Sequence, residues 1–294
     1  MFCACGQKAI VDDGYCKACF VEHFEQAVTE TIEQFQLVQA TDRVAVAVSG
    51  GKDSLTILYL LKKWGYAVTA LCVDEGIAGY RDHTLADAQK FCQQQNISLI
   101  ITSFKELFGF TLDEQYRGGS ACLTCGVLRR YALNMQAKSF DKIVTGHNLD
   151  DEVQSILMNF FKGNLALAAG LGPVSGTTGG LFTQRVKPLY FCTEKEVRTY
   201  AFLMNFEVGY NECPYARESF RFQVQQALNN TFTRQEKLNL ARNFLQLLPA
   251  LKQHLPKTTV RHCQRCGEIS RGELCKACML LSVPSAFPPA EGNL

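Results

Sequence analysis

The feature that most constrains the fold is an apolar strand that runs through a glycine-rich loop directly into an apolar helix. The strand is VAVAV at 44–48, and the helix is DSLTILYLLKKWG at 53–65. Between them stands SGGKDS, from Ser49 to Ser54. A chain that buries such a strand and covers it with the next helix builds an α/β sheet, with the loop at the carboxyl end of the strand.

The composition of this loop is that of an anion-binding turn. Gly50 and Gly51 allow a tight turn whose backbone N–H groups point inward, and the helix N-terminus and Lys52 add positive charge. The spacing differs from that of a Walker A loop, which needs four residues between its first Gly and the Gly-Lys pair. SGGKDS instead resembles the PP-loop of ATP pyrophosphatases, which cleave ATP between the α and β phosphates and adenylate a substrate. The resemblance implies that ATP is held by Ser49, Gly50, Gly51, Lys52, Asp53 and Ser54.

Strands and helices alternate along the rest of the central region. Further strands are predicted at 67–73, 97–102 and 142–146, and helices at 81–95, 123–138 and 150–162. This alternation predicts an α/β fold, a Rossmann-like parallel sheet of the adenine nucleotide α-hydrolase type with helices on both faces. The Gly-, Ser- and Thr-rich stretch 163–184 is predicted to be a long loop, and the pattern becomes helical again at 216–250.

Acidic residues follow two more of the predicted strands. Asp74 lies at the carboxyl end of the second strand, where open α/β sheets place ligands. GHNLDDEVQS begins at Gly146, after the fourth strand, and enters a helix. We expect Asp74, Gly146 and Asp151 to bind the nucleotide. Asp150 and Asp151 would hold Mg²⁺ or contact the activated substrate, which makes Asp150 a candidate catalytic residue, whereas Glu152 fits a helix-capping role.

We expect no signal peptide, so the fourteen cysteines should lie in a reducing compartment, where clustered cysteines indicate metal more often than disulfides. The two ends repeat one another, with CACGQKAIVDDGYCKAC near the start and CQRCGEISRGELCKAC near the end. They predict two zinc modules, 1–22 and 256–282. Each would hold one Zn²⁺ on four thiolates: Cys3, Cys5, Cys16 and Cys19, and Cys263, Cys266, Cys275 and Cys278. The one-residue spacer between Cys3 and Cys5 is unusual, and His23 could replace Cys3.

Three cysteines in the central region are one fewer than a closed zinc site needs. Cys122 and Cys125 lie one turn apart at the start of a predicted helix, and Cys213 follows in NECPYARES. Either a redox-active Cys122/Cys125 pair passes a persulfide sulfur, or the three thiolates hold a [4Fe–4S] cluster whose fourth iron is open to bind sulfide. The three remaining cysteines lie singly in apolar runs and are predicted to be core residues: Cys72, Cys92 and Cys192.

These motifs occur in one order in a known family. SGGKDS, CLTCG, GHNLDDEVQS, ECPY and the terminal Cys modules make nearly the whole chain resemble the tRNA 2-thiouridine synthetases, a group of PP-loop ATP pyrophosphatases. The resemblance implies that Cys122, Cys125 and Cys213 bind a [4Fe–4S] cluster, that the loop holds ATP, and that the substrate is a uridine in tRNA. Arg129, in a catalytic role, and Arg130 would face the phosphates or the transferred sulfide.

The implied reaction has a chemical reason. The O2 of uracil is a poor leaving group, and adenylation at the loop, assisted by Lys52, turns it into AMP, which sulfide delivered by the cluster displaces at C2. A tRNA must therefore dock with one base extruded. The alternatives are a sulfurtransferase that works through a Cys122/Cys125 persulfide and a PP-loop enzyme for a small molecule. The sulfur donor could be sulfide, a persulfide carrier or a ubiquitin-like thiocarboxylate. The abundance of glutamine favours the wobble uridine over the T-loop uridine, which is thiolated mainly in thermophiles.

The distribution of charge offers a place for the tRNA. The chain has a net charge of +2, yet residues 214–265 contain nine Lys or Arg against two acids. A basic helical segment, 214–255, at the end of a PP-loop domain spanning 23–255, predicts a track for RNA phosphates. No apolar run approaches the ~20 residues of a membrane span, so we expect a soluble, cytoplasmic protein with no membrane partner. A homodimer is a further expectation, and the Pro-rich tail 283–294 is predicted to be disordered.

Overall fold

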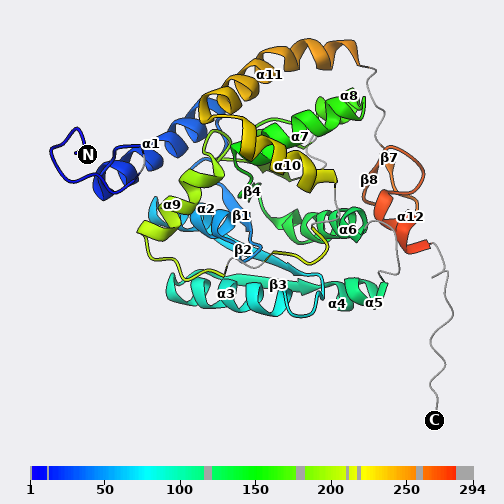
Figure 1. Ribbon diagram of the computed structural model, residues 1–294. Coiled ribbons are helices and arrows are strands. Elements are labelled where there is room, and N and C mark those ends of the chain that lie inside the picture. The colour runs from blue at the N-terminus through cyan, green and yellow to red at the C-terminus, as the bar shows by residue number, and fades with distance from the viewer. Residues whose placement is uncertain are drawn as a thin grey trace.

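The computed structural model describes residues 2–11, 13–115, 121–176, 183–209, 212–216, 220–255 and 261–282. At its centre is a six-stranded sheet with helices on both faces (Figure 1). In sheet order the strands are β3 (Leu99–Ser103), β2 (Ala67–Asp74), β1 (Arg43–Ala47), β4 (Lys142–Thr145), β6 (Gln184–Val186) and β5 (Val174–Ser175). All neighbours pair in parallel except β5, which is antiparallel to β6. The predicted mostly parallel, Rossmann-like sheet is confirmed.

The stretch 163–184 is not the long loop that its composition predicts. It contains the short helix α8 (Leu165–Ala168), strand β5 and the first residue of β6. These two strands have two and three residues, which is too short to show an alternating apolar pattern. They join the sheet because β6 pairs with β4 and β5 pairs with β6, and no local pattern in the sequence predicts these contacts.

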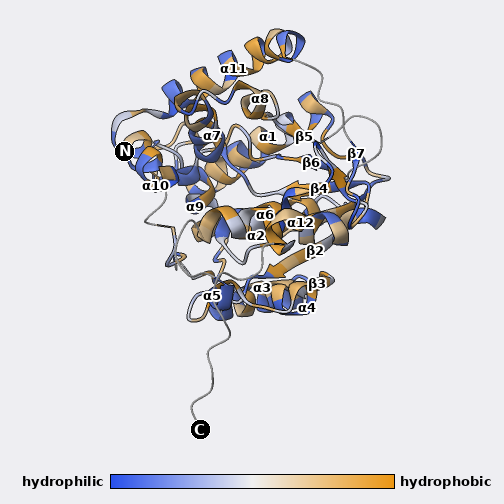
Figure 2. Cartoon of the chain, turned by 90° about the vertical axis from the view of Figure 1, so that its right-hand side faces the viewer, coloured by the Kyte–Doolittle hydropathy of each residue, from blue (hydrophilic) through white to orange (hydrophobic). Residues whose placement is uncertain are grey.

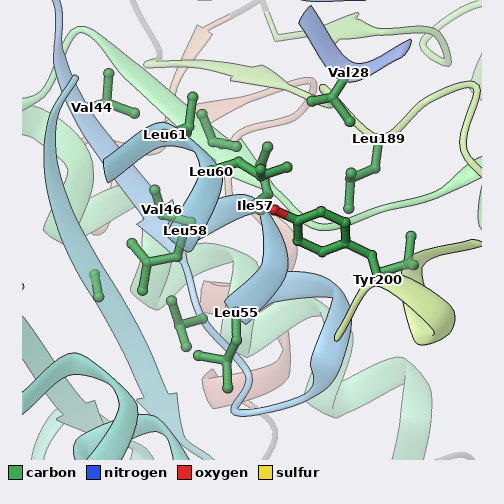
Figure 3. Packing of buried hydrophobic residues seen from close by; sticks show 14 of the residues in the cluster. Val28, Val44, Val46, Leu55, Ile57, Leu58, Leu60, Leu61, Leu189 and Tyr200 are labelled. Atoms are coloured by element: carbon green, nitrogen blue, oxygen red, sulfur yellow. The ribbon is translucent and has the colours of Figure 1, made fainter. Parts of the chain in front are cut away.

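One face of the sheet is covered by α1 (Lys17–Phe35), α2 (Lys52–Lys63), α3 (Arg81–Gln94) and α9 (Glu194–Leu203). Helix α2 is central in this layer and packs between β1 and Tyr200 of α9 (Figure 3). Burial of each aliphatic side chain of α2 contributes about 1.5–3 kcal/mol relative to its exposure. The fully buried ones, which hold α2 firmly behind the phosphate loop, are Leu55, Ile57, Leu58, Leu60 and Leu61.

The opposite face is covered by α6 (Ala121–Gln136) and the 3₁₀ helix η1 (Ala137–Ser139). Ala45 and Ile143 point from the strands to this side and pack with Ala137, whereas the neighbouring Val44 faces the α2 layer. In Figure 2 the strands β2 and β3 are orange, as expected for continuous apolar strands of a doubly covered sheet. Two short helices follow β3, α4 (Phe104–Phe108) and α5 (Leu112–Gln115).

Three more helices pack together beside the sheet: α7 (Leu149–Phe161), α10 (Phe220–Thr231) and α11 (Arg234–His254). Val153, Leu228 and Leu238 belong to their shared core. A buried ion pair crosses this core, with Nζ of Lys237 on α11 lying 2.6 Å from Oδ1 of Asp150 on α7. Helices α10 and α11 confirm the predicted return of a helical pattern after residue 216.

The two cysteine-rich ends lie on opposite sides of the molecule (Figure 1). The first continues into α1. The second forms β7 (Arg261–His262), β8 (Ile269–Ser270) and α12 (Lys276–Ser282). This C-terminal module packs on α6, where Ala277 and Cys278 share a core cluster with Val127 and Leu128. The tail 283–294, which we expected to be disordered, lies outside the described residues.

The three cysteines expected in the core are there. Cys72, Cys92 and Cys192 are each 2% exposed, which confirms the prediction from their apolar surroundings. Among the helices that the structure describes, none is both long and apolar enough to span a bilayer.

Candidate active site

The SGGKDS loop touches two neighbouring elements at points that leave no room for a Cβ atom. Gly50 has a φ of +89°, and a Cβ there would lie 1.9 Å from the carbonyl oxygen of Thr84 on α3. At Gly146, just after β4, a Cβ would lie 2.7 Å from the backbone nitrogen of Ser54. Both positions therefore need glycine because another backbone passes so close. For Gly146, this packing role accompanies the nucleotide contact expected from the sequence.

Two serine hydroxyls hold the loop in shape. The hydroxyl of Ser54 accepts a hydrogen bond from the N–H of Ser49 at 3.2 Å and donates one to the carbonyl of Gly51 at 2.9 Å. The hydroxyl of Ser49 accepts from the N–H of Gly51 at 3.3 Å. Gly51 precedes α2, and no side chain among the described residues caps that helix. The backbone N–H groups of its first turn are therefore available to an anion such as a phosphate.

Lys52 lies between two carboxylates at the start of α2. Its Nζ is 3.0 Å from Oδ2 of Asp53 and 3.1 Å from Oε1 of Glu194 on α9. Burial alone would lower the pKa of Lys52, but these two carboxylates raise it above its ordinary value, so the ammonium stays charged. Sequence reasoning missed Glu194, because only the packing of α9 beside α2 brings it here.

The loop after β4 is tied to the phosphate loop through Asn148. This residue caps α7, since its side-chain oxygen accepts from the N–H of Asp151 at 3.1 Å. Its Nδ2 donates to Oδ1 of Asp53 at 3.1 Å. Burial raises the pKa of Asp53 most, and the negative charge of Asp151 raises it further. Two of the predicted site residues, Asp53 and Asp151, are thus electrostatic neighbours.

The three adjacent acids of α7 already have partners. Asp150 accepts from the N–H of Glu194 at 2.7 Å and pairs with Lys237 at 2.6 Å, so it links three elements. Asp151 pairs with Arg221 at 2.9 Å in addition to its capping bond. Glu152, expected to be a capping residue, is instead buried and lies 2.6 Å from Nζ of Lys187. Its other oxygen, Oε2, has no hydrogen-bond partner among the described residues.

A chain of polar contacts, buried at Arg81 and Glu75 and exposed at Arg129, connects the phosphate loop with the cysteine helix α6. Nη1 of Arg81 donates to the carbonyl of Ser49 at 2.5 Å, and its Nε pairs with Glu75 at 2.9 Å. The other carboxylate oxygen of Glu75 lies 3.3 Å from Nη1 of Arg129. Asp74, beside Glu75, accepts the N–H of Gly76 at 2.8 Å at the end of β2. Sequence reasoning missed Glu75 and Arg81, although both stand in the motif VDEGIAGYRD that contains Asp74.

The structure brings the three central cysteines into one region. Cys125 and Cys213 belong to the same apolar cluster, together with Tyr80 and Tyr215. The exposed Cys122 donates its S–H to the carbonyl of Tyr215 at 3.3 Å. Burial raises the pKa of Cys125 to about 12, and it also raises the pKa of Cys213. In the part of the chain that is described, the three sulfurs do not form a group as compact as the terminal cysteine sets.

The terminal cysteines form two compact four-sulfur groups. In each group the four Sγ atoms lie within 4.8 Å of one another. Two of the Sγ–Sγ distances are 3.6 Å, between Cys5 and Cys16, and 3.7 Å, between Cys266 and Cys275. A tetrahedral zinc ion with Zn–S bonds of about 2.3 Å places its sulfurs about 3.8 Å apart. The first group contains Cys3, while His23 stacks on Tyr15 with ring centroids 5.2 Å apart.

The predicted basic track is partly occupied by contacts within the protein. Arg234 lies 2.8 Å from Glu196, and Arg221 and Lys237 pair with the acids of α7 described above. Arg242 lies over the ring of Phe191, 5.8 Å from its centroid. Arg217 and Lys257 lie outside the described residues. Four of the nine cations of this segment are therefore engaged within the protein, which the count of charges could not show.

Comparison with known proteins places this site in a family. The protein-family model of the PP-loop domain matches residues 21–228 of the sequence. The chain is 35% identical to a tRNA-5-methyluridine(54) 2-sulfurtransferase of Pyrococcus horikoshii, over 93% of this chain and 91% of that protein. It is 34% identical to the cytoplasmic tRNA 2-thiolation protein 1 of Candida glabrata, over 90% of this chain and 79% of that protein.

A solved structure agrees along almost the whole chain. The U34-tRNA thiolase NcsA of Methanococcus maripaludis, determined with its [4Fe–4S] cluster, superposes with a TM-score of 0.79 and 33% identity and covers 95% of both chains. The chain belongs to the PP-loop family of tRNA 2-thiolation sulfurtransferases.

Proposed function

We propose that the protein is an ATP-dependent tRNA uridine 2-sulfurtransferase. The observation that supports this most directly is the contact chain from Ser49 through Arg81 and Glu75 to Arg129. Arg129 lies one turn past Cys125 on α6. A nucleotide loop and a thiolate site joined in this way suit a reaction that activates a base at one site and transfers sulfur to it from the other.

The reaction balances without a change of oxidation state. The O2 of uracil attacks the α-phosphorus of ATP, the bond to the bridging oxygen of the β-phosphate breaks, and pyrophosphate leaves. Hydrosulfide then attacks C2, and AMP leaves with the former O2. The proton of the hydrosulfide passes to solvent, and the sulfur remains at the oxidation level of sulfide. Each thiolation therefore consumes one ATP and yields one AMP and one pyrophosphate.

The residues of the loop have distinct parts in the first step. The first-turn N–H groups of α2 and the charged Lys52 would hold the polyphosphate. Mg²⁺ would accompany it, with Asp53 and Asp151 as acidic neighbours. Asp150 has both oxygens engaged by Lys237 and by the backbone N–H of Glu194, so its part is to position α7. Asp74, at the end of β2, stays a proposed nucleotide contact.

Cys122, Cys125 and Cys213 would hold the [4Fe–4S] cluster, and their surroundings fit such a group. Apolar and aromatic side chains enclose two of the thiols, and a metal charge would favour the thiolate forms that burial disfavours. When bound, a cluster on three thiolates offers an open iron to a sulfide. The cluster in the thiolase of M. maripaludis supports this assignment over a Cys122/Cys125 persulfide.

The terminal cysteine groups fit structural Zn²⁺. Their sulfur spacing matches a tetrahedral ion, and four thiolates close the coordination shell, so these sites would stabilise the fold without taking part in the chemistry. We propose Cys3 over His23 as the fourth ligand of the first site, because Cys3 lies in the compact group.

Alanine variants of the three central cysteines test the cluster assignment. Anaerobically reconstituted wild type should hold about four irons on three thiolates. Cys213→Ala should lose both the iron and the thiolation of tRNA, whereas Cys92→Ala, a buried cysteine far along α3, should keep its iron. A Cys213→Ala variant with full activity would instead support the persulfide route through Cys122 and Cys125.

The modified uridine, the sulfur donor, the oligomeric state and the cellular location are further predictions, and each has a direct test. Nucleoside mass spectrometry of tRNA from a deletion strain should locate the missing thiouridine, which we expect at the wobble position. Activity with sulfide alone would show that a persulfide carrier or a thiocarboxylate protein is dispensable as the donor. Analytical ultracentrifugation would test the expected homodimer, and fluorescence microscopy would test a cytoplasmic location.

A further inference from the structure

The guanidinium of Arg185 lies against the cysteine helix α6 at Arg130, and no acid of the described residues pairs with either arginine. Nη2 of Arg185, on β6, donates to the backbone carbonyl of Arg130, on α6, at 3.2 Å. The same nitrogen donates to Oδ1 of Asn134, one turn further along α6, at 2.6 Å. These two bonds fix the guanidinium of Arg185 beside α6 and leave its other N–H groups for a ligand.

No carboxylate pairs with either arginine among the residues that the structure describes. The other cations of this region differ in this respect: Arg129 pairs with Glu75, Lys187 with Glu152, and Arg221 with Asp151. Arg130 is exposed, and Arg185 is partly exposed. The pair is therefore reachable from solvent and carries two charges that no acid of the described residues compensates.

The two guanidinium groups repel one another. Burial first, and then the charges of Arg130 and Arg129, together lower the pKa of Arg185 to about 10. The pKa of Arg130 is also lowered, first by burial and then by Arg129. Like charges held together are unfavourable in the free protein, and a bound anion relieves this repulsion.

The pair belongs to the cysteine side of the site. Arg130 lies on the cysteine helix α6, and its Nη1 is 3.6 Å from where a Cβ would stand at Gly126, the residue after Cys125. Lys52, in the phosphate loop, has partners of its own in Asp53 and Glu194. An anion on the pair would thus lie near the thiols, apart from the polyphosphate of ATP.

We propose that Arg130 and Arg185 form a binding site for a backbone phosphate of the tRNA, next to the uridine that enters the active site. This inference rests on the proposed function and names a contact with its substrate. The uracil ring is neutral and cannot balance two cations, whereas the phosphates that flank an extruded nucleotide must lie close to the reacting base. The planar forks of two guanidinium groups match the oxygens of a phosphate.

Salt dependence of tRNA binding tests the site directly. An unmodified tRNA transcript is titrated against the wild type and the double variant Arg130→Ala/Arg185→Ala between about 50 and 200 mM salt. Loss of one phosphate contact should reduce the slope of log K against log [salt] by about 1 and weaken binding about tenfold. Arg185→Lys should keep most of the slope and lose part of the affinity, because an ammonium lacks the fork.

Two controls separate the outcomes. Arg43→Ala removes an arginine that is 67% exposed at the start of β1, and it should leave the slope unchanged. The affinity for a non-hydrolysable ATP analogue and the iron content should be unchanged in the double variant. An unchanged slope, or an equal loss of affinity for the ATP analogue, overturns the phosphate site while the wild type still binds and thiolates tRNA. If the wild type binds no tRNA, the proposed function fails as well.

Discussion

Arg81 on α3 donates a hydrogen bond to the backbone carbonyl of Ser49 at 2.5 Å, across 32 residues of sequence. It is 4% exposed and also pairs with Glu75, which is buried to the same extent. Because Glu75 reaches Arg129 as well, one carboxylate holds two arginines, one under the phosphate loop and one on the cysteine helix. The position of the loop therefore depends on an ion pair beneath it.

Removing the charge of Glu75 should destabilise the protein. Glu75→Gln leaves the guanidinium of Arg81 buried without a counter-charge, and we expect the free energy of unfolding to fall by about 3 kcal/mol. The affinity for an ATP analogue should fall too, because Arg81 supports Ser49. Urea denaturation measures the first effect. Glu114→Gln, in an exposed pair with Lys105, is the matched control and should cost less than about 1 kcal/mol. Equal effects of the two substitutions would contradict the role of Glu75.

Gly50→Ala should abolish ATP binding, because its Cβ would lie 1.9 Å from the carbonyl oxygen of Thr84. The matched variant Gly65→Ala has a similar φ of +84°, but nothing lies within 4 Å of its Cβ. It should therefore show only the cost of the positive φ, about 1 kcal/mol of stability. Calorimetric titration with an ATP analogue compares them. Normal affinity in Gly50→Ala would mean that the loop and α3 can separate freely.

His147 predicts how stability depends on pH. Its side chain is exposed to solvent, but the surrounding protein and the charges of Lys187 and Arg221 lower its pKa below the ordinary value of 6.5. The unfolded chain therefore takes up a proton at this position below about pH 6.5, where the folded protein does not, so acid favours unfolding. Stability should fall as the pH decreases through this range, and His147→Gln should lessen the fall. Parallel curves of urea midpoint against pH for the two proteins would contradict this assignment.

The C-terminal zinc module should support the cysteine helix. Because its helix α12 packs on α6, Cys275→Ser/Cys278→Ser should loosen α6 and lower the iron content after reconstitution. The equivalent change in the N-terminal module, Cys16→Ser/Cys19→Ser, lies on the other side of the molecule and should leave the iron bound (Figure 1). Iron and zinc analysis of both variants tests this. Retention of iron in the C-terminal variant would mean that α6 holds its place alone.

The sequence predicted the parts of the fold that depend on local patterns. The strands and helices predicted from continuous apolar runs and their alternation lie close to the observed bounds of β1 to β4 and of α2, α3, α6 and α7. The repeated Cys spacing located both four-sulfur groups. Strands β5 and β6 were not predicted, because two or three residues are too few to show a hydrophobic periodicity. Helix α1 was not predicted, because the cysteines and acids near the start of the chain indicated only a metal module.

The contacts of the site depended on tertiary packing and could not be predicted. Nothing local in the sequence distinguishes Lys237, which pairs with Asp150 in the core, from a cation free to meet RNA. Arg221, Arg234 and Arg242 likewise have partners within the protein. The opposite holds for Arg185, which lies in the short strand β6 and has no acidic partner in the part of the chain that the structure describes. The sequence shows the net charge of a segment. Which of its cations can still bind a ligand depends on the ion pairs that form in the folded protein.

The most direct test of the proposed ATP-dependent thiolation is the product balance of a single anaerobic reaction. Reconstituted protein is incubated with ATP, sulfide and an unmodified tRNA transcript, and 2-thiouridine, AMP, ADP and pyrophosphate are quantified together. We expect 2-thiouridine in the tRNA with one AMP and one pyrophosphate for each sulfur transferred. Lys52→Ala should lose all three products while its iron content is unchanged. ADP as the main product, or thiouridine formed without ATP, would contradict the proposed reaction.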